Sequence, residues 1–557
     1  MKPRWVAESL GASLLLLLPG FEPLLMPGRI ALLHHRMDLQ NLLGGFVIDL
    51  LLATALSLAV LALLSRLTAR YKLLLSAPFV AVICFHIVYY ICKLLCVLLQ
   101  LRQKQLASAP QQTPQSVFLP NSLALLPLFF SILIPTVLLF LAKYKPLYGQ
   151  KAFFAIRSIP YCFSFCALWI LPTLAVLSLS GNSAQNFDHA SALPSNPDQP
   201  RVVWLIFDEL SHDQVFDHPS QPDLFRDLQK FQAQSVDFAN ILPFDDYTER
   251  IIPSLLEGRK IDQIRSDDSG DLLVRDNGRP DWHPFDSRNS LIGTAHDTGW
   301  NPAIAGWYNP YCRIFSSLLS ACSWQPGIFG YIDAEVSGAS LSDSVWKNAL
   351  AMPRHYLTIW NLLPAENAMT MQATDIRDFR SVNEKARRIL QEENLRFIFI
   401  HLPTPHPPGI YNRNTHQFCA CGNYIDNLAL TNDTLRDLLA VIDQTHSASH
   451  TTVIVSSDHS WRVPVWSAQS YWTPEEERLT HHHFDPRPVF LVRFPGSEPE
   501  MRIAAPTPEM REHDIVDSIL RGKLRSEQDL IASLPASGTA RALLPNAAPT
   551  GPSEDPY

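Results

Sequence analysis

The sequence has no excess of basic residues. Its 45 Lys and Arg are outnumbered by 53 Asp and Glu, which gives a formal net charge of −8. This balance argues against nucleic acid as the main partner. No internal repeat is apparent, and 557 residues are too many for one ordinary core. We therefore expect two to four domains of different composition.

The first third of the chain has very few charged residues over five long stretches. Each stretch is long enough to cross a bilayer, which takes roughly 20 apolar residues. They are Trp5–Met26, Leu42–Leu64, Leu73–Leu99, Leu123–Leu141 and Tyr161–Leu179. A cleaved signal peptide can account for the first stretch but not for the four that follow. We predict a transmembrane helical domain of five spans over residues 1–180.

The short loops between these stretches differ in basic residues. With the N-terminus inside, the inner loops hold nine Lys and Arg and the outer loops four. Because basic loops stay on the cytoplasmic side, five spans place the rest of the chain on the periplasmic face of the inner membrane. Residues 181–200, rich in Ser, Asn, Pro and Asp, are predicted to be a linker. Residues 536–557, dense in Ala, Pro, Ser and Gly, are predicted to be a disordered tail.

Cysteine is scarce, and the nine residues divide at the same boundary. Five lie in the apolar stretches, where cysteine is usually a small core hydrophobe. The other four can form disulfides in an oxidising compartment. Cys312 with Cys322 is the favoured pair, because Cys419 and Cys421 are separated by one residue and would close a strained ring. Zinc is the alternative for the latter two, although no second pair has zinc-site spacing.

From Arg201 onward, short apolar runs alternate with amphipathic segments, which is typical of an α/β domain with a mostly parallel sheet. The predicted strands are Val202–Phe207, Pro302–Trp307, Phe397–His401, Thr452–Ser456 and Val489–Arg493. The predicted helices are Pro222–Gln234, Thr248–Glu257, Ile376–Glu392 and Tyr424–Gln444. We place this domain over residues 201–535.

Candidate ligands follow three of these strands. They are Asp208 and Glu209 after the first strand, His401 and His406 around the end of the third, and Asp458 and His459 after the fourth. Ligands of open α/β sheets bind at the carboxyl ends of the strands, so we expect these side chains to meet. Carboxylate and imidazole groups together suit Zn²⁺ or Mn²⁺ better than Ca²⁺. Taken alone, Asp208 and Glu209 are equally well explained as the start of a solvated loop.

Thr248 is a candidate nucleophile. It follows a loop that contains Pro243 and Asp245, at a point where a helix can begin. A helix N-terminus and a bound cation would both stabilise an alkoxide and an incoming anion there. The alternative is that Thr248 only caps the helix, as threonine often does.

Together these residues resemble the alkaline phosphatase superfamily in its sulfatase-like branch. The resemblance is specifically to membrane enzymes such as lipoteichoic acid synthases and lipid A phosphoethanolamine transferases. Those enzymes carry five transmembrane helices followed by an extracytoplasmic sulfatase-like domain. The resemblance covers nearly the whole chain except the tail, and it implies a doubly wound, mostly parallel sheet.

The metal-site motifs match by position. Asp208 falls at the family's first metal ligand, and Glu209 at a second acidic position that sulfatases use. The pair Asp458-His459 resembles the Asp-His pair that completes the metal site, with Ser460 in place of the usual Gly. The resemblance thus implies a metal site of Asp208, Glu209, Asp458 and His459.

The nucleophile and substrate positions also match. Thr248 lies ten residues before Gly258, and Pro-Ser-Leu-Leu-Glu-Gly resembles the family's Pro-Ser-Leu-Leu-Thr-Gly. Thr248 thereby takes the nucleophile position, and His406, within Pro-His-Pro, the substrate-side position of a second catalytic residue. Weaker substrate candidates are His401, Arg462 and His483.

The resemblance implies an enzyme that transfers a phospho-substituent from a phospholipid headgroup to a glycan acceptor or water. The transfer would pass through a phosphothreonine at Mn²⁺ or Zn²⁺. Sulfatases convert a Cys or Ser within Cys/Ser-x-Pro-x-Arg to formylglycine, and Thr248-Glu-Arg-Ile-Ile offers neither residue, which disfavours sulfate hydrolysis by that route. Two alternatives stay open: a hydrolase of phosphate or sulfate esters, and a non-catalytic membrane protein that keeps the fold for partner binding.

Overall fold

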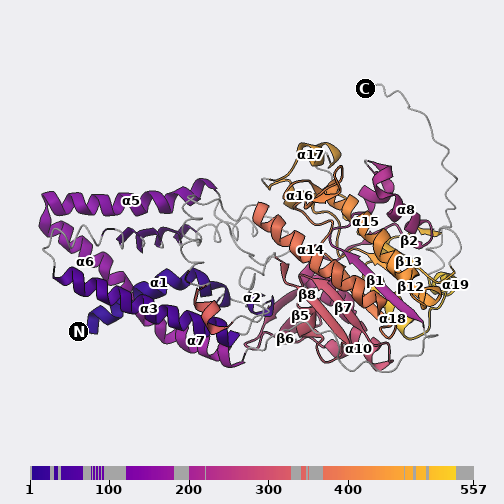
Figure 1. Cartoon of the computed structure of the whole chain (residues 1–557), viewed down its shortest axis with the longest axis horizontal. Coiled ribbons are helices and arrows are strands. Elements are labelled where there is room, and N and C mark those ends of the chain that lie inside the picture. The colour runs from indigo at the N-terminus through magenta and orange to yellow at the C-terminus, as the bar shows by residue number, and fades with distance from the viewer. Residues whose placement is uncertain are drawn as a thin grey trace, which may run out of the picture. The chain divides into compact units, whose positions relative to one another are not determined.

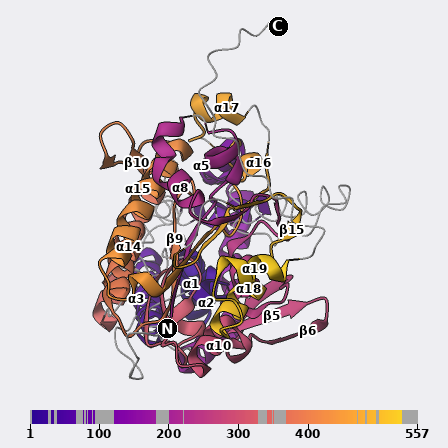
Figure 2. The ribbon, with the colours of Figure 1, turned by 90° about the vertical axis from the view of Figure 1, so that its right-hand side faces the viewer.

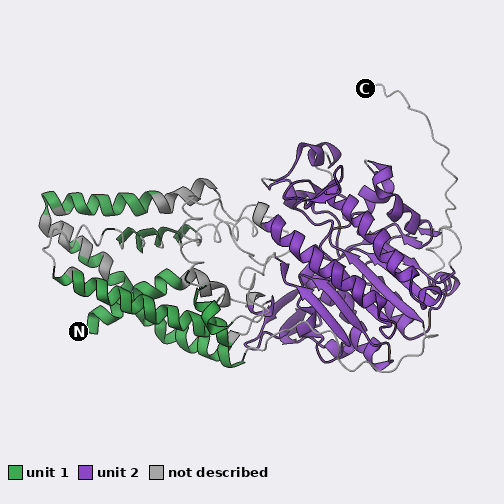
Figure 3. Cartoon of the chain, in the orientation of Figure 1, with its two compact units in different colours: residues 1–29, 37–182, 335–366 green, residues 30–36, 183–334, 367–557 purple. Residues whose placement is uncertain are grey.

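The computed structural model of the chain describes most of its residues. The described residues are 3–25, 30–34, 39–66, 121–180, 200–219, 221–327, 340–346, 368–469, 471–480, 484–496 and 501–534, with short pieces between 77 and 92 and residue 349. They divide into two compact units (Figure 3). One unit comprises residues 1–29, 37–182 and 335–366, and the other 30–36, 183–334 and 367–557.

The first unit is helical. Its helices are α1 (Pro3–Leu25), α3 (Leu39–Ser65), α5 (Asn121–Tyr144), α6 (Pro146–Phe163) and α7 (Ala167–Ser180). Helix α1 packs against α3 and α6, and α5 packs against α6. Several apolar side chains point outward, among them Leu168 at 78% and Leu179 at 82% exposure. Exposed apolar side chains gathered on helices are typical of surfaces that face lipid or another protein.

Two helices of this unit are long and apolar enough to cross a membrane, Gln40–Leu63 and Ser158–Ser180. They correspond to the second and fifth predicted spans. The fourth predicted span contains a shorter apolar helix, Phe129–Leu141, and the first contains α1, which does not meet the same criterion. Most of the third predicted span, Leu73–Leu99, lies outside the described residues. Five spans were predicted, and the described residues contain two helices that are long and apolar enough to cross a membrane.

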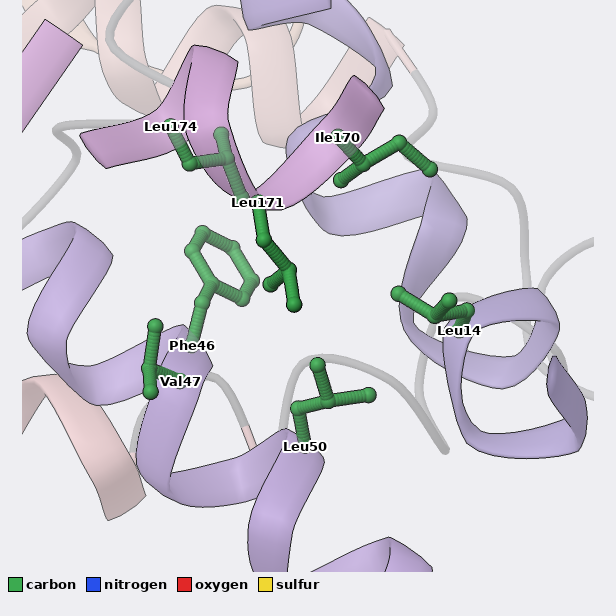
Figure 4. A pocket seen from close by; sticks show the side chains of 7 residues that line it. All are labelled: Leu14, Phe46, Val47, Leu50, Ile170, Leu171 and Leu174. Carbon is green, nitrogen blue, oxygen red and sulfur yellow. The ribbon is translucent and has the colours of Figure 1, made fainter. Parts of the chain in front are cut away.

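A small pocket within this unit is lined only by apolar side chains from α1, α3 and α7 (Figure 4). They are Leu14, Phe46, Val47, Leu50, Ile170, Leu171 and Leu174. None of these side chains carries a group that can bind a cation or transfer a proton. This pocket therefore offers no site for the candidate chemistry.

An eight-stranded sheet forms the centre of the second unit (Figures 1 and 2). Its strands are β1 (Arg201–Phe207), β2 (Val236–Phe238), β7 (Ala303–Trp307), β8 (Ala321–Gln325), β9 (Phe397–Leu402), β12 (Thr451–Ser456), β13 (Phe490–Arg493) and β14 (Met501–Ile503). They lie in the order β14-β2-β13-β12-β1-β9-β7-β8. Five of the seven pairings are parallel, and only β13 pairs antiparallel with its neighbours β12 and β2.

Helices cover both faces of this sheet. They include α8 (Arg226–Gln232), α9 (Thr248–Glu257), α10 (Leu291–Asp297), α14 (Ala368–Gln391), α15 (Tyr424–Asp443) and α18 (Arg511–Leu520). Successive side chains of a strand point to opposite faces. Accordingly, Trp204 of β1 lies in an apolar core with α9, α10 and α18, and Leu205 lies in a second core with α8, α14 and α15. The predicted doubly wound, mostly parallel α/β sheet is confirmed.

Smaller elements surround the sheet. Three small sheets consist of β4 (Gln263–Ser266), β5 (Leu272–Asp276) and β6 (Arg279–Pro284); of β10 (Tyr411–Asn412) and β11 (Gln417–Phe418); and of β3 (Ile241–Leu242) and β15 (Thr507–Pro508). The short helices are α2 (Ile30–His34), α11 (Tyr311–Ile314), α16 (Val463–Trp466), α17 (Pro474–Thr480) and α19 (Glu527–Ser533). The predicted linker and tail fall almost wholly outside the described residues.

Both cysteine pairs of this unit are disulfide-bonded. The predicted bond between Cys312 and Cys322 joins the start of α11 to β8, with 5.6 Å between the Cα atoms. Cys419 and Cys421 are also bonded, contrary to the expectation that ring strain would keep them apart. The turn between β11 and α15 brings their Cα atoms to 5.0 Å, within the range that a disulfide bridges.

Candidate active site

The carboxyl ends of three neighbouring strands meet at one edge of the sheet. Asp208 directly follows β1, His401 is the penultimate residue of β9, and Asp458 follows β12 by two residues. Strand β1 lies between the other two in parallel register, with Ile206 opposite both His401 and Ser456. The three polar side chains are fully buried. The sheet therefore brings together the candidate ligands that the strand ends predicted.

The hydroxyl group of Thr248 lies among these ligands. Thr248 Oγ1 donates to Asp458 Oδ2 at 2.6 Å, and it lies 3.3 Å from His459 Nε2 and 3.5 Å from Asp208 Oδ2. Thr248 is the first residue of α9, and the residue at the N-cap is Tyr247. Thr248 is thus not the cap of the helix, and its hydroxyl is near the N-terminal N–H groups that favour an anion.

The buried groups fit a divalent metal ion. Ligand atoms of Asp208, His401 and Asp458 lie within 4.8 Å of one another. Two of the buried atoms, Asp208 Oδ1 and His401 Nε2, have no hydrogen-bond partner among the described residues. Leaving such atoms without a partner costs free energy, and a cation held by these side chains would satisfy both. Carboxylate and imidazole donors suit Zn²⁺ and Mn²⁺ alike, so the identity of the ion stays open.

The charge states of these groups follow from their burial. Burial raises the pKa of Asp208 well above its ordinary value, and the nearby carboxylates of Asp458 and Glu209 raise it further. Burial also lowers the pKa of His401 to about 4, and it lowers the pKa of His459 well below 6.5. Both imidazoles are therefore neutral at pH 7, as metal ligation requires. A cation would relieve the repulsion between the crowded carboxylates.

Glu209 makes a different set of contacts. Its backbone is in the left-handed region, with φ of 66°, and its side chain is fully buried. Arg462 donates from Nε to Glu209 Oε1 at 2.6 Å, and Trp466 Nε1 donates to Oε2 at 2.7 Å. Burial raises the pKa of Glu209 to about 7, although the charge of Arg462 opposes this shift. Glu209 thereby fixes the position of the largely buried guanidinium group of Arg462 beside the predicted ligands.

His406 lies between two aromatic side chains. Its ring centroid is 5.3 Å from Trp307 and 5.0 Å from Trp466, in edge-to-face arrangements. Ligand atoms of His406, Asp208 and Glu209 lie within 4.8 Å of one another, so His406 faces the same site. Burial lowers the pKa of His406 well below 6.5, which leaves a neutral imidazole at pH 7.

A tight turn after β7 supports the start of α9. Tyr308 has a left-handed backbone, with φ of 68°. Its hydroxyl group donates to Glu249 Oε2 at 3.0 Å, and Asn309 Nδ2 donates to the carbonyl oxygen of Thr248 at 3.2 Å. The turn therefore contacts both Thr248 and the residue that follows it.

The structure also shows contacts that no sequence motif revealed. Tyr311 Oη lies 2.7 Å from His401 Nδ1 and orients that ring. His401 was expected to be a weaker substrate contact, yet its Nε2 lies 3.8 Å from Asp208 Oδ2. A histidine at the end of an otherwise apolar buried strand was the signal for this position.

Arg462, expected to contact substrate, makes an ion pair with Glu209. His483 lies outside the described residues.

Comparisons with known proteins find only distant structural likeness. No family model and no curated protein matches the chain. A sulfatase from Pseudoalteromonas sp. is 12% identical with a TM-score of 0.38, covering 58% of this chain and 68% of that one. Phosphonate monoester hydrolase of Agrobacterium radiobacter is 12% identical with a TM-score of 0.34, covering 58% and 74%. Murine ectonucleotide pyrophosphatase/phosphodiesterase 5 is 9% identical with a TM-score of 0.33, covering 58% and 95%.

At these values the likeness establishes neither family nor activity. What the fold and the site define is a class: an α/β protein with buried Asp, His and Thr side chains gathered at the carboxyl edge of its sheet.

Proposed function

We propose that the chain is a metal-dependent enzyme that acts on phosphate esters with Thr248 as its nucleophile. The observation that carries the proposal is the 2.6 Å hydrogen bond from Thr248 Oγ1 to the buried Asp458. This bond gives the hydroxyl proton an acceptor at the start of a helix. The finer proposal is a transferase that moves a phospho-substituent from a phospholipid headgroup to a glycan hydroxyl or water.

The site residues fit the roles that such a metal enzyme needs. Asp208, Asp458 and His459 would hold a Mn²⁺ or Zn²⁺ ion, with His401 and Glu209 as further candidate ligands. When bound, the ion supplies positive charge that lowers the pKa of the Thr248 hydroxyl and polarises a phosphoryl oxygen.

The first step forms a phosphothreonine. Thr248 Oγ1 forms a bond to phosphorus, and the bond from phosphorus to the diacylglycerol oxygen breaks. The hydroxyl proton passes to Asp458, which already accepts it in a hydrogen bond. The diacylglycerol oxygen takes a proton from solvent and leaves as an alcohol. Arg462, held by Glu209, offers a positive charge to the phosphoryl oxygens beside these groups.

The second step restores the threonine. The oxygen of the acceptor hydroxyl forms a bond to phosphorus, and the bond to Thr248 Oγ1 breaks. The neutral imidazole of His406 takes the acceptor proton and releases it to solvent, and Thr248 regains its own proton from Asp458. If water is the acceptor, the same steps describe a hydrolase, which is why hydrolysis of phosphate esters remains the second candidate. The presence of all four of Asp208, Thr248, Asp458 and His459 disfavours a non-catalytic protein.

Anchoring in the inner membrane belongs to the same proposal. Two long apolar helices are consistent with membrane anchoring or a signal peptide. We propose all five predicted spans in residues 1–180, a linker over 181–200, and a periplasmic catalytic domain over 201–535. A lipid donor would then be encountered at high effective concentration by an enzyme confined to the same membrane.

The proposal is tested by release of diacylglycerol. Full-chain protein in detergent with Mn²⁺ or Zn²⁺ is incubated with phosphatidylethanolamine and phosphatidylglycerol, and separately with 4-nitrophenyl sulfate. We expect diacylglycerol from one of the lipids, none from Thr248→Ala, and partial activity in Thr248→Ser. A matched control is Thr298→Ala, since Thr298 lies at the exposed end of α10. Undiminished turnover in Thr248→Ala would overturn the proposal, and sulfate hydrolysis without diacylglycerol release would favour the hydrolase.

A further inference from the structure

The second unit includes a short segment from the first third of the chain. Residues 30–36, which contain α2, belong to it although α1 and α3 on either side belong to the other unit. Leu33 is buried at 1% exposure in the same apolar core as Ile251 and Ile252 of α9. Helix α2 also lies against β4. The segment is therefore part of the core that supports the helix carrying Thr248.

His34 makes a specific contact within this unit. It is fully buried, and its Nδ1 lies 2.7 Å from the carbonyl oxygen of Tyr308, with the two rings 5.3 Å apart. A carbonyl oxygen can only accept, so His34 Nδ1 carries the proton and donates. Burial lowers the pKa of His34 to about 3, which agrees with a neutral ring. The donor is therefore present over the whole physiological pH range.

Tyr308 connects this contact to the nucleophile. Its left-handed backbone directs the carbonyl group to His34, while its hydroxyl group donates to Glu249 and the adjacent Asn309 donates to the carbonyl oxygen of Thr248. The backbone N–H of Tyr308 donates to Gln325 on β8. A left-handed tyrosine persists only where its surroundings hold it, and these contacts do so.

We propose that His34 is a positioning residue for Thr248. The hydrogen bond from His34 holds the Tyr308 turn in its left-handed form, and the turn holds the first two residues of α9 in place. Helix α2 is then a required part of the catalytic unit and not merely a connection between two apolar helices. The inference rests on the proposed function for its effect on turnover, but not for its effect on the structure of the turn.

Three full-chain variants test this role. His34→Leu removes the donor, and His34→Asn places an amide N–H near the position of Nδ1. Leu530→Ala, in α19 and the same apolar core as Leu33, is the control for loss of core packing away from the turn. Turnover of bis(4-nitrophenyl) phosphate gives kcat and KM, thermal unfolding gives stability, and amide hydrogen exchange of the metal-free protein gives local order.

In His34→Leu we expect kcat to fall about 10- to 100-fold, because a displacement of about 1 Å can cost that much. We expect the KM of His34→Leu to stay within about two-fold of the wild-type value. We expect His34→Asn to restore most of kcat, because its amide group holds the turn and thereby keeps Thr248 in place. Hydrogen exchange should quicken at 248–252 and 308–311 in His34→Leu and not in Leu530→Ala.

Two results would overturn the positioning role. One is exchange at both segments in His34→Leu that matches the wild type. The other is quickening of equal extent throughout the second unit, as in a general loss of stability. If the wild-type protein turns over neither bis(4-nitrophenyl) phosphate nor a phospholipid, the proposed function fails, and hydrogen exchange alone then decides on His34.

Discussion

The residues of the site differ most in how their charge is compensated. Asp208 and Asp458 are buried close together, and Asp208 Oδ1 has no hydrogen-bond partner among the described residues. Glu209 is equally buried, but Arg462 and Trp466 donate to both of its oxygens. A bound cation would compensate the charges of Asp208 and Asp458, whereas Glu209 already has the guanidinium group of Arg462 as its counter-charge. We therefore assign Glu209 the role of holding the Arg462 side chain in place.

The role of Glu209 predicts a loss of stability in Glu209→Gln. The amide keeps the volume of the side chain but removes the charge-assisted hydrogen bonds to the largely buried Arg462, which we expect to cost about 1.5–3 kcal/mol. Urea denaturation of the full chain in detergent measures the change. The control is Glu384→Gln, because Glu384 pairs with Arg388 on the exposed surface of α14. We expect at most about 1 kcal/mol there, and equal losses in the two variants would contradict the ion pair described for Glu209.

At the scale of elements, helix α2 gives a pH-dependent stability. Burial lowers the pKa of His34 to about 3 in the folded state, against 6.5 when it is exposed. Between these values the unfolded chain binds a proton that the folded chain does not, so stability is lost as the pH falls below 6.5. From pH 7 to pH 5 we expect the wild type to lose about 2 kcal/mol more than His34→Asn. If both proteins lose the same free energy of unfolding between pH 7 and pH 5, His34 is not buried in its neutral form.

The elements that carry the site were predictable from local pattern. Strands β1, β9 and β12 each contain a short apolar run with a polar candidate ligand at or just after its end, so both the strands and the edge were evident. Strand β6 was not predicted, because its residues are polar and largely exposed and show no apolar alternation.

Other features depend on contacts between distant residues. The hydrogen bond between His34 and Tyr308 joins residues 274 positions apart. The hydrogen bond from Arg462 to Glu209 joins residues 253 positions apart. No local pattern encodes such a pair.

The whole molecule combines a helical unit with outward apolar side chains and an α/β unit with a buried polar site. The five spans that we propose would place the second unit in the periplasm. Reporters fused to the C-terminus test this topology. An alkaline phosphatase reporter, which is active only outside the cytoplasm, should be active. A green fluorescent protein reporter should not fluoresce. Fusions after Arg66, in a predicted inner loop, should give the opposite pair of results. A fluorescent C-terminal fusion with an inactive phosphatase would contradict the topology.

In the mechanism that we propose, Thr248 carries a covalent phospho-substituent during turnover. The most direct measurement is mass spectrometry of the peptide containing Thr248 after brief incubation of the full-chain protein with mixed phospholipids, followed by acid quenching. We predict an added mass on Thr248 equal to a phosphoryl group with its headgroup, which would also identify the donor, and no such mass in Thr248→Ala. An unmodified Thr248 in protein that is releasing diacylglycerol, or an adduct on another residue, would contradict the account.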